Sequence, residues 1–96
     1  MESIYRIKNV VVRAEVKSPN GSYPINSIAP NQNLGLVNYN KLVDDLEFMF
    51  NGFFKTNSKS KFNSFSIGFE YYDVHNTNVA LFIERKLDVQ LNSATV

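Results

Sequence analysis

Residues 65–91 read FSIGFEYYDVHNTNVALFIERKLDVQL, and apolar side chains occupy almost every odd position. Successive side chains of a β-strand point to opposite faces, so this alternation predicts two strands that each bury one face. The turn-rich segment 73–78 separates the two runs and completes the pattern of a β-hairpin. Because both strands bury their odd residues, residues that face each other across the hairpin must share parity.

Shared parity requires a connecting loop with an odd number of residues, unless a bulge intervenes. A loop of residues 76–78 would place Glu70 opposite Glu84, and like charges in that position destabilise a strand pair. A loop of residues 74–78 avoids this pair and is therefore preferred.

The N-terminal segment, residues 4–17, predicts another strand, but its apolar phase changes partway. Tyr5 and Ile7 are on odd positions, whereas from Val10 onward the apolar residues are even. A straight strand cannot bury both sets on one face. A β-bulge near Lys8 and Asn9 would add one residue and restore a common face, and we prefer it to two shorter strands.

A turn and a long connection follow this strand. Residues 18–22 predict a turn, in which Gly21 is free to adopt a positive φ. Residues 23–37 contain Pro24, Pro30 and Gly35 together with several asparagines, which predicts an irregular connection. Its apolar residues would anchor it to the core. Brief extended segments at 23–25 and 34–37 are the alternatives.

One amphipathic helix is predicted to begin after an N-cap at Asn38 or Asn40. Its apolar residues form one stripe, which is too aromatic for a solvated surface and is therefore expected to cover the sheet. Gly52 is expected to end the helix. The stripe consists of Leu42, Leu46, Met49, Phe50 and Phe53, widened by Val43 and Phe54.

Together these segments predict an α+β fold: an antiparallel sheet of three to four strands with one amphipathic helix packed on one face, in the order β-loop-α-β-β. Residues 1–96 are expected to form a single domain, with residues 92–96 as a frayed tail. The face of the sheet opposite the helix would then have no second helix to cover it.

Composition limits the function. The net charge of +1 argues against a dedicated nucleic-acid binder, and the absence of cysteine excludes disulfides, thiolate catalysis and cysteine-based metal sites. No apolar run is long enough for a membrane span, and the N-terminus does not resemble a signal peptide, so a cytoplasmic protein is expected. The asparagine-rich composition suggests an AT-rich coding sequence, as is common in phages and mobile elements.

No catalytic, cofactor-binding or metal-binding residue is predicted, and we do not expect an enzyme. Asp73 and His75 could offer two metal ligands, but a metal site normally needs three or four. Asp44, Asp45 and Glu47 fall on the polar side of the helix, where charge is expected.

Two aromatic residues, Tyr72 and Phe82, fall on the even, polar positions of the hairpin. Exposed aromatic patches often mark partner sites. The first hypothesis is therefore a small non-catalytic protein that binds another protein, as an inhibitor or adaptor. Its predicted partner-binding residues are Tyr72, Phe82, Glu70, Glu84 and Lys86.

Two alternatives remain. A nucleic-acid-binding module would use basic residues beside aromatic ones, and a self-assembling subunit or homodimer would use the open face or edge of the sheet. The basic residues in question are Lys55, Lys59 and Lys61, with Arg6, Lys8, Arg13 and Lys17 of the N-terminal strand.

Overall fold

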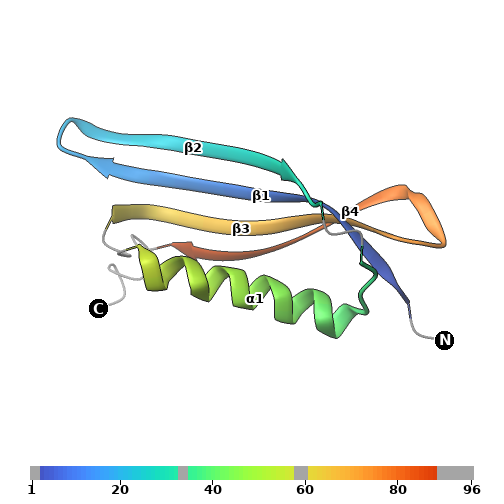
Figure 1. The fold of residues 1–96 in the computed structure, drawn as a ribbon. Helices are drawn as coiled ribbons and strands as arrows, with labels where there is room; N and C mark the ends of the chain where they lie inside the picture. The colour runs from blue at the N-terminus through green and yellow to red at the C-terminus, as the bar shows by residue number, and fades with distance from the viewer. Residues whose placement is uncertain (1–2, 33–34, 58–60, 89–96) are drawn as a thin grey trace.

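The computed structural model describes residues 3–32, 35–57 and 61–88 (Figure 1). Four antiparallel strands form one sheet in the order β2-β1-β3-β4, and a helix lies across one face of it. The predicted α+β class is confirmed. The elements are β1 (Tyr5–Ser18), β2 (Gly21–Pro30), α1 (Tyr39–Thr56), β3 (Phe62–Asp73) and β4 (Asn76–Asp88). The predicted tail at 92–96 lies outside the described residues.

The prediction of an irregular connection at 23–37 is wrong for residues 23–30, which belong to β2, and the expected brief edge strand at 23–25 is part of this longer strand. Of the described residues that follow, 31, 32, 35 and 36 belong to no helix or strand, and Val37 forms an isolated bridge with Tyr5. The strand β2 pairs with β1 along its whole length, from Ser18↔Gly21 to Asn9↔Pro30. The turn at 18–22 is confirmed, and Gly21 has a φ of 119°. The element order is therefore β-β-α-β-β. Proline normally argues against a strand, but at a sheet edge its missing N–H can face solvent.

The predicted bulge in β1 is confirmed. Ile7 pairs with Tyr71 and Asn9 pairs with Glu70, so Lys8 is the extra residue. The bulge brings Tyr5 and Ile7 onto the same face as Val10, which pairs with Phe69. One continuous strand thus presents both apolar sets to the helix.

The hairpin of β3 and β4 confirms the parity argument and corrects the loop. Phe69 pairs with Ile83 and Glu70 with Phe82, which is the register that a loop of residues 74–78 would give. The loop itself is only Val74 and His75, because Asp73 already pairs with Asn76. The register then shifts between Asp73 and Tyr71, where β4 has more residues than β3, and the surplus residues form a bulge in β4. The Asp73 carboxylate accepts the His75 backbone N–H at 2.8 Å, which stabilises this short turn.

The helix begins as predicted, at an N-cap formed by Asn38, whose side-chain oxygen accepts the Lys41 backbone N–H at 2.9 Å. The expected end at Gly52 is wrong, because α1 continues to Thr56. Glycine within a helix costs only about 1 kcal/mol. The extra turn places Phe53 in a stacked contact with Phe65, at 4.0 Å between ring centroids, and this aromatic burial outweighs the cost.

We expect Asn38→Ala to lower the free energy of unfolding by about 1 kcal/mol, because the substitution removes the acceptor for the Lys41 N–H. Chemical denaturation measures the change. Asn40→Ala is the matched control: Asn40 is exposed inside the first turn and should have little effect. Equal losses for the two variants would contradict the assignment of the cap.

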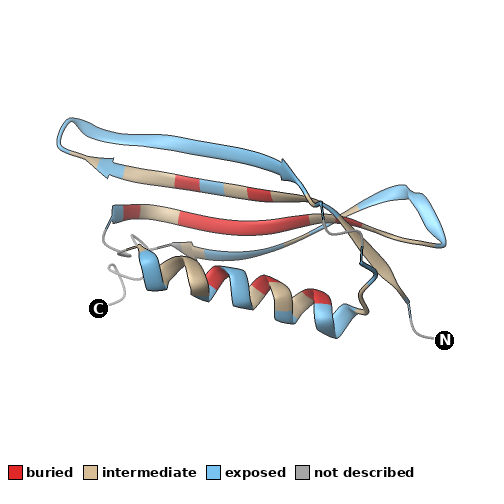
Figure 2. Cartoon of the chain, viewed as in Figure 1, coloured by how far each residue is buried: buried red, intermediate tan, exposed pale blue. Residues whose placement is uncertain are grey.

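The core lies between α1 and the sheet (Figure 2). Leu42, Leu46 and Phe50 are buried on the helix, as predicted, whereas Met49 is 38% exposed. They pack against buried residues of β3, namely Phe65, Ile67, Phe69 and Tyr71. At the β4 margin the Arg85 Nε contacts the Glu47 carboxylate of the helix at 2.9 Å. No helix within the described residues is long and apolar enough to cross a membrane.

One helix cannot cover four strands. A helix with its side chains is about 10 Å wide and strands are spaced by about 4.8 Å, so α1 covers roughly two of them. It lies over β3 and β4, and every residue of β2 is exposed (Figure 2). Within the described part of the chain, two surfaces therefore remain open: the face opposite the helix, called the outer face below, and the free edge of β2.

Candidate protein-binding face

The five residues that the sequence predicted for partner binding all lie on the outer face. The register places Glu70 opposite Phe82, Gly68 opposite Glu84 and Ser66 opposite Lys86. Tyr72 continues the same row of β3 and is half-buried next to Arg6 of β1. The alternation of side-chain direction along β3 and β4, together with the pairing of these strands, is sufficient to bring the five residues together.

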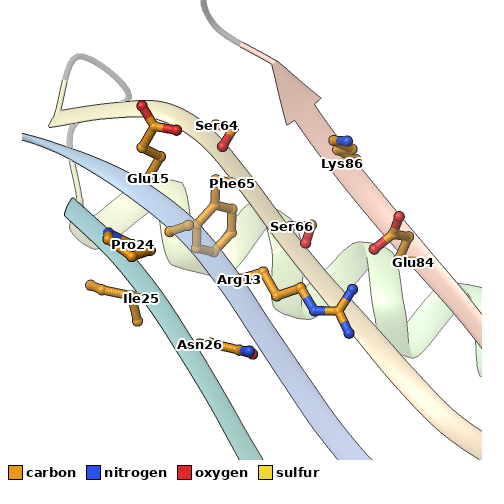
Figure 3. Close-up of a pocket in the computed structure, with 11 residues that line it drawn as sticks. Arg13, Glu15, Pro24, Ile25, Asn26, Ser64, Phe65, Ser66, Glu84 and Lys86 are labelled. Carbon is orange, nitrogen blue, oxygen red and sulfur yellow. The ribbon is translucent and has the colours of Figure 1, made fainter. Parts of the chain in front are cut away.

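A depression of about 330 Å³ follows the outer face of β3 (Figure 3). It forms because β3 presents the small side chains of Ser64 and Ser66 there, while β1 and β4 present long ones, and it extends to Pro24, Ile25 and Asn26 of β2. Arg13 extends from β1 toward β4, where Glu84 and Lys86 line the opposite wall. The outer face is thus hollowed along its central strand and has charged walls.

Phe82 of β4 lies on the same face as this furrow but not in its lining. A Cβ atom added to Gly68 would lie 2.5 Å from the Phe82 Cζ, so the ring sits directly over the glycine. Phe82 is still 45% exposed, and the Arg13 guanidinium lies 5.8 Å from its ring centroid. Beyond the ring is a second depression of about 290 Å³, whose lining includes Val11, Ile28 and Ala80. Phe82 is therefore an accessible aromatic side chain in the lining of the second depression.

The charges on the outer face are of both signs. Hydrogen bonds hold two carboxylates in place: Asn9 donates to Glu70 at 3.0 Å, and Asn63 donates to Glu15 at 2.9 Å. Among the residues that the structure describes, strand pairing places these charged side chains on the face: Arg6, Arg13, Lys17 and Lys86 with Glu15, Glu70 and Glu84. The surface therefore has no single sign of charge.

The basic residues of the nucleic-acid hypothesis do not form one patch. Lys55 is exposed in the last turn of α1, in the layer opposite Arg6 and Arg13 of the outer face. Lys61 is exposed just before β3. Lys59 lies outside the described residues. Acidic side chains separate the outer-face cations, as described above.

No group of three or more histidine, cysteine, aspartate or glutamate side chains that could hold a metal ion occurs in the described part of the chain. Asp45 forms an ion pair with Lys41, one helical turn away.

Burial raises the pKa of the Tyr71 hydroxyl, and the neighbouring Tyr39 and Tyr5 raise it further, so this phenol stays neutral and packs as a core residue.

Sequence reasoning missed Ile28 as a member of the outer face and placed it in a packed connection. A signal was available in the sequence. After the Asn-Gly turn the apolar residues change from odd positions, Tyr23 and Ile25, to an even position, Ile28, which places Ile28 on the opposite face of a strand. Arg13 was assigned to the nucleic-acid hypothesis, and its position beside Phe82 needed the register of three strands.

Comparisons with protein-family models, curated proteins and solved structures gave no match, so the functional argument rests on this geometry.

Proposed function

We propose that this chain is a non-catalytic binding protein that docks another protein on the outer face of its sheet. The observation that carries the proposal is the half-exposed Phe82 in the lining of the second depression, beside Arg13 and with Tyr72 further along the face. Aromatic anchors surrounded by polar residues are typical of the energetically important part of a protein interface. A partner side chain that enters the second depression would contact Phe82 and Arg13 together.

The mixed charge supports a protein partner over a nucleic acid. A phosphate backbone is bound by an excess of lysine and arginine, which gives a steep dependence on salt. Here Glu70 and Glu84 lie among the cations of the same face. A protein can match both signs by placing opposite charges across the interface, which improves specificity more than affinity.

Such a chain would act by occupying its partner's surface, as an inhibitor, or by bridging two proteins, as an adaptor. The asparagine-rich composition favours a phage or mobile-element origin and hence a host protein as the target.

The test is the double variant Tyr72→Ala/Phe82→Ala. The tagged chain is used to capture its partner from an extract of the native host, and the purified partner is then titrated calorimetrically. We expect the variant to lose at least about 100-fold in affinity, because an aromatic anchor contributes about 2 kcal/mol. Its melting temperature should stay near that of the wild type, because neither side chain belongs to the core cluster.

Two controls make the result specific. Phe48→Ala removes a more exposed aromatic residue on the other layer and should leave binding unchanged. Lys55→Gln/Lys61→Gln should also have little effect. A folded double variant with wild-type affinity would refute the proposal, and loss of binding only in the lysine variant would favour nucleic acid instead.

A further inference from the structure

Among the described residues, the free edge of β2 has little of the usual protection against strand pairing. β2 is ten residues long, every residue is exposed, and its sequence GSYPINSIAP contains no charged side chain. Natural sheet edges are normally blunted by charge, by proline, by bulges or by a covering segment, because unpaired N–H and C=O groups otherwise bind a further strand. Only the proline device is present in β2, at Pro24 and Pro30.

The direction of each backbone group in β2 follows from one hydrogen bond. The Asn31 N–H donates to the Lys8 carbonyl of β1 at 2.9 Å. Backbone groups alternate in direction along a strand, so odd residues of β2 bond to β1 and even residues point to the free edge. The backbone groups of both prolines therefore point to the free edge, where each proline still offers its carbonyl oxygen. The outward donors that remain on β2 are Ser22, Asn26 and Ile28.

We propose that this edge pairs in antiparallel fashion with β2 of a second copy of the chain, with Asn26 facing Asn26 across a two-fold axis. In this register the two Asn26 residues exchange both backbone hydrogen bonds. The Ile28 N–H of each copy faces the Pro24 carbonyl of the other, and the Ser22 N–H faces the Pro30 carbonyl. The outward carbonyl of each proline therefore meets a donor, although proline itself donates nothing.

Two neighbouring registers are poorer. Placing Ser27 on the axis would set Pro24 opposite Pro30, where neither residue can donate a hydrogen bond. Placing Ile28 on the axis keeps the hydrogen bonds but sets the apolar Ile25 opposite the polar Asn31. With Asn26 on the axis, Tyr23 lies across from Ala29, which covers part of a side chain that is 52% exposed.

A second copy fits this edge better than a charged partner strand. β2 carries no charge along its length, so two copies meet without repulsion and offer no charge for a foreign strand to match. The pairing places both α1 helices on the same side of a continuous sheet and leaves both outer faces open. It is therefore compatible with the proposed function, although Pro24, Ile25 and Asn26 of β2 also line the first depression of the outer face.

The chain has no cysteine, so an engineered cysteine reports contact directly. Facing residues in a hydrogen-bonded antiparallel pair have Cα atoms about 5.5 Å apart, within the range of a disulfide. We expect Asn26→Cys to form a disulfide-linked dimer at least tenfold faster than Asn76→Cys, a control at the exposed hairpin of β4. Equal rates would overturn the proposal, and faster trapping through Ile28→Cys would overturn the register.

The Asn26→Pro variant tests the backbone hydrogen bonds of the proposed interface without an engineered cysteine. It removes an outward N–H, as Pro24 and Pro30 already do, and should preserve the pairing with β1. We expect sedimentation equilibrium to show a wild-type dimer and a dissociation constant at least tenfold higher for Asn26→Pro, because two hydrogen bonds per dimer are lost. Ser27→Pro instead removes an N–H that points to β1, so it should lower the melting temperature.

Three outcomes would refute this dimer: a wild-type monomer at every concentration, a dimer that Asn26→Pro does not weaken, or a dimer that Tyr72→Ala/Phe82→Ala dissolves. The last would move the interface to the outer face. A wild-type monomer that binds a strand of another protein through the β2 edge would also refute it. Asn26 also lines the first depression, so partner binding by Asn26→Pro is compared with that by Asn26→Ala, which keeps the backbone N–H. Equal binding by the monomeric Asn26→Pro variant and the dimeric Asn26→Ala variant separates this proposal from the proposed function.

Discussion

Replacing Phe50 with alanine is expected to lower the free energy of unfolding by about 3–5 kcal/mol, the usual range for a buried phenylalanine. Phe50 is 5% exposed at the centre of the helical stripe. Its ring packs edge-to-face with Phe54 at 5.1 Å and lies 5.8 Å from the ring of Phe65. A domain of this size has a total stability of about 5–15 kcal/mol, so the variant is expected to be close to unfolding.

Phe48 provides the matched control, because it is the same residue type in the same helix and is 79% exposed. Phe48→Ala should change the stability by less than about 0.5 kcal/mol. Thermal and denaturant unfolding of both variants give the comparison. A melting temperature for Phe50→Ala within a few degrees of the wild type would show that the helix does not bury this face.

The second large effect is expected for Gly68→Val. A Cβ atom at this position would lie 2.5 Å from the Phe82 Cζ and 3.0 Å from the Ile83 carbonyl oxygen. The ring can swing away into solvent, but the carbonyl oxygen belongs to the backbone of β4 and cannot. We expect a loss of about 1–3 kcal/mol, as for other overpacked sites. The displaced ring should also weaken partner binding, because Phe82 would leave its place in the lining of the second depression.

A double-mutant cycle with Phe82→Ala separates the two contacts. Without the ring, only the contact with the Ile83 carbonyl remains, so Gly68→Val should cost less in that background. Coupling energies of 0.5 kcal/mol or more are usual for residues in contact, which is within reach of denaturant unfolding. An identical cost in both backgrounds would mean that Phe82 does not rest on Gly68.

The candidate face was largely predictable, because it depends on parity. Tyr72, Phe82, Glu70, Glu84 and Lys86 share a face as soon as the two strands are assigned and paired. What parity could not reveal is the shape of this face. The furrow requires β1 to lie beside β3, so that Arg13 and Glu15 form a wall facing Glu84 and Lys86 across small residues.

The elements whose assignment failed are those in which local preference opposed tertiary packing. Gly52 is a weak helix former, yet α1 continues through it because the rings of Phe53 and Phe54 gain contacts with Phe65. Pro24 and Pro30 are poor strand residues, yet β2 forms because its odd residues satisfy β1 while both prolines face outward. In each case a long-range contact outweighed a local cost of about 1 kcal/mol or less.

The sequence by itself determined the hairpin parity, the bulge at Lys8, the cap at Asn38 and the helical stripe, because each is set by periodicity or by a hydrogen bond between near neighbours. The tertiary structure alone decided the strand order β2-β1-β3-β4, the extent of β2 and the two-residue turn at Val74 and His75. These features depend on pairing between segments far apart in the chain. Such pairing depends on the burial and hydrogen bonding that the whole sheet provides, which no single segment encodes.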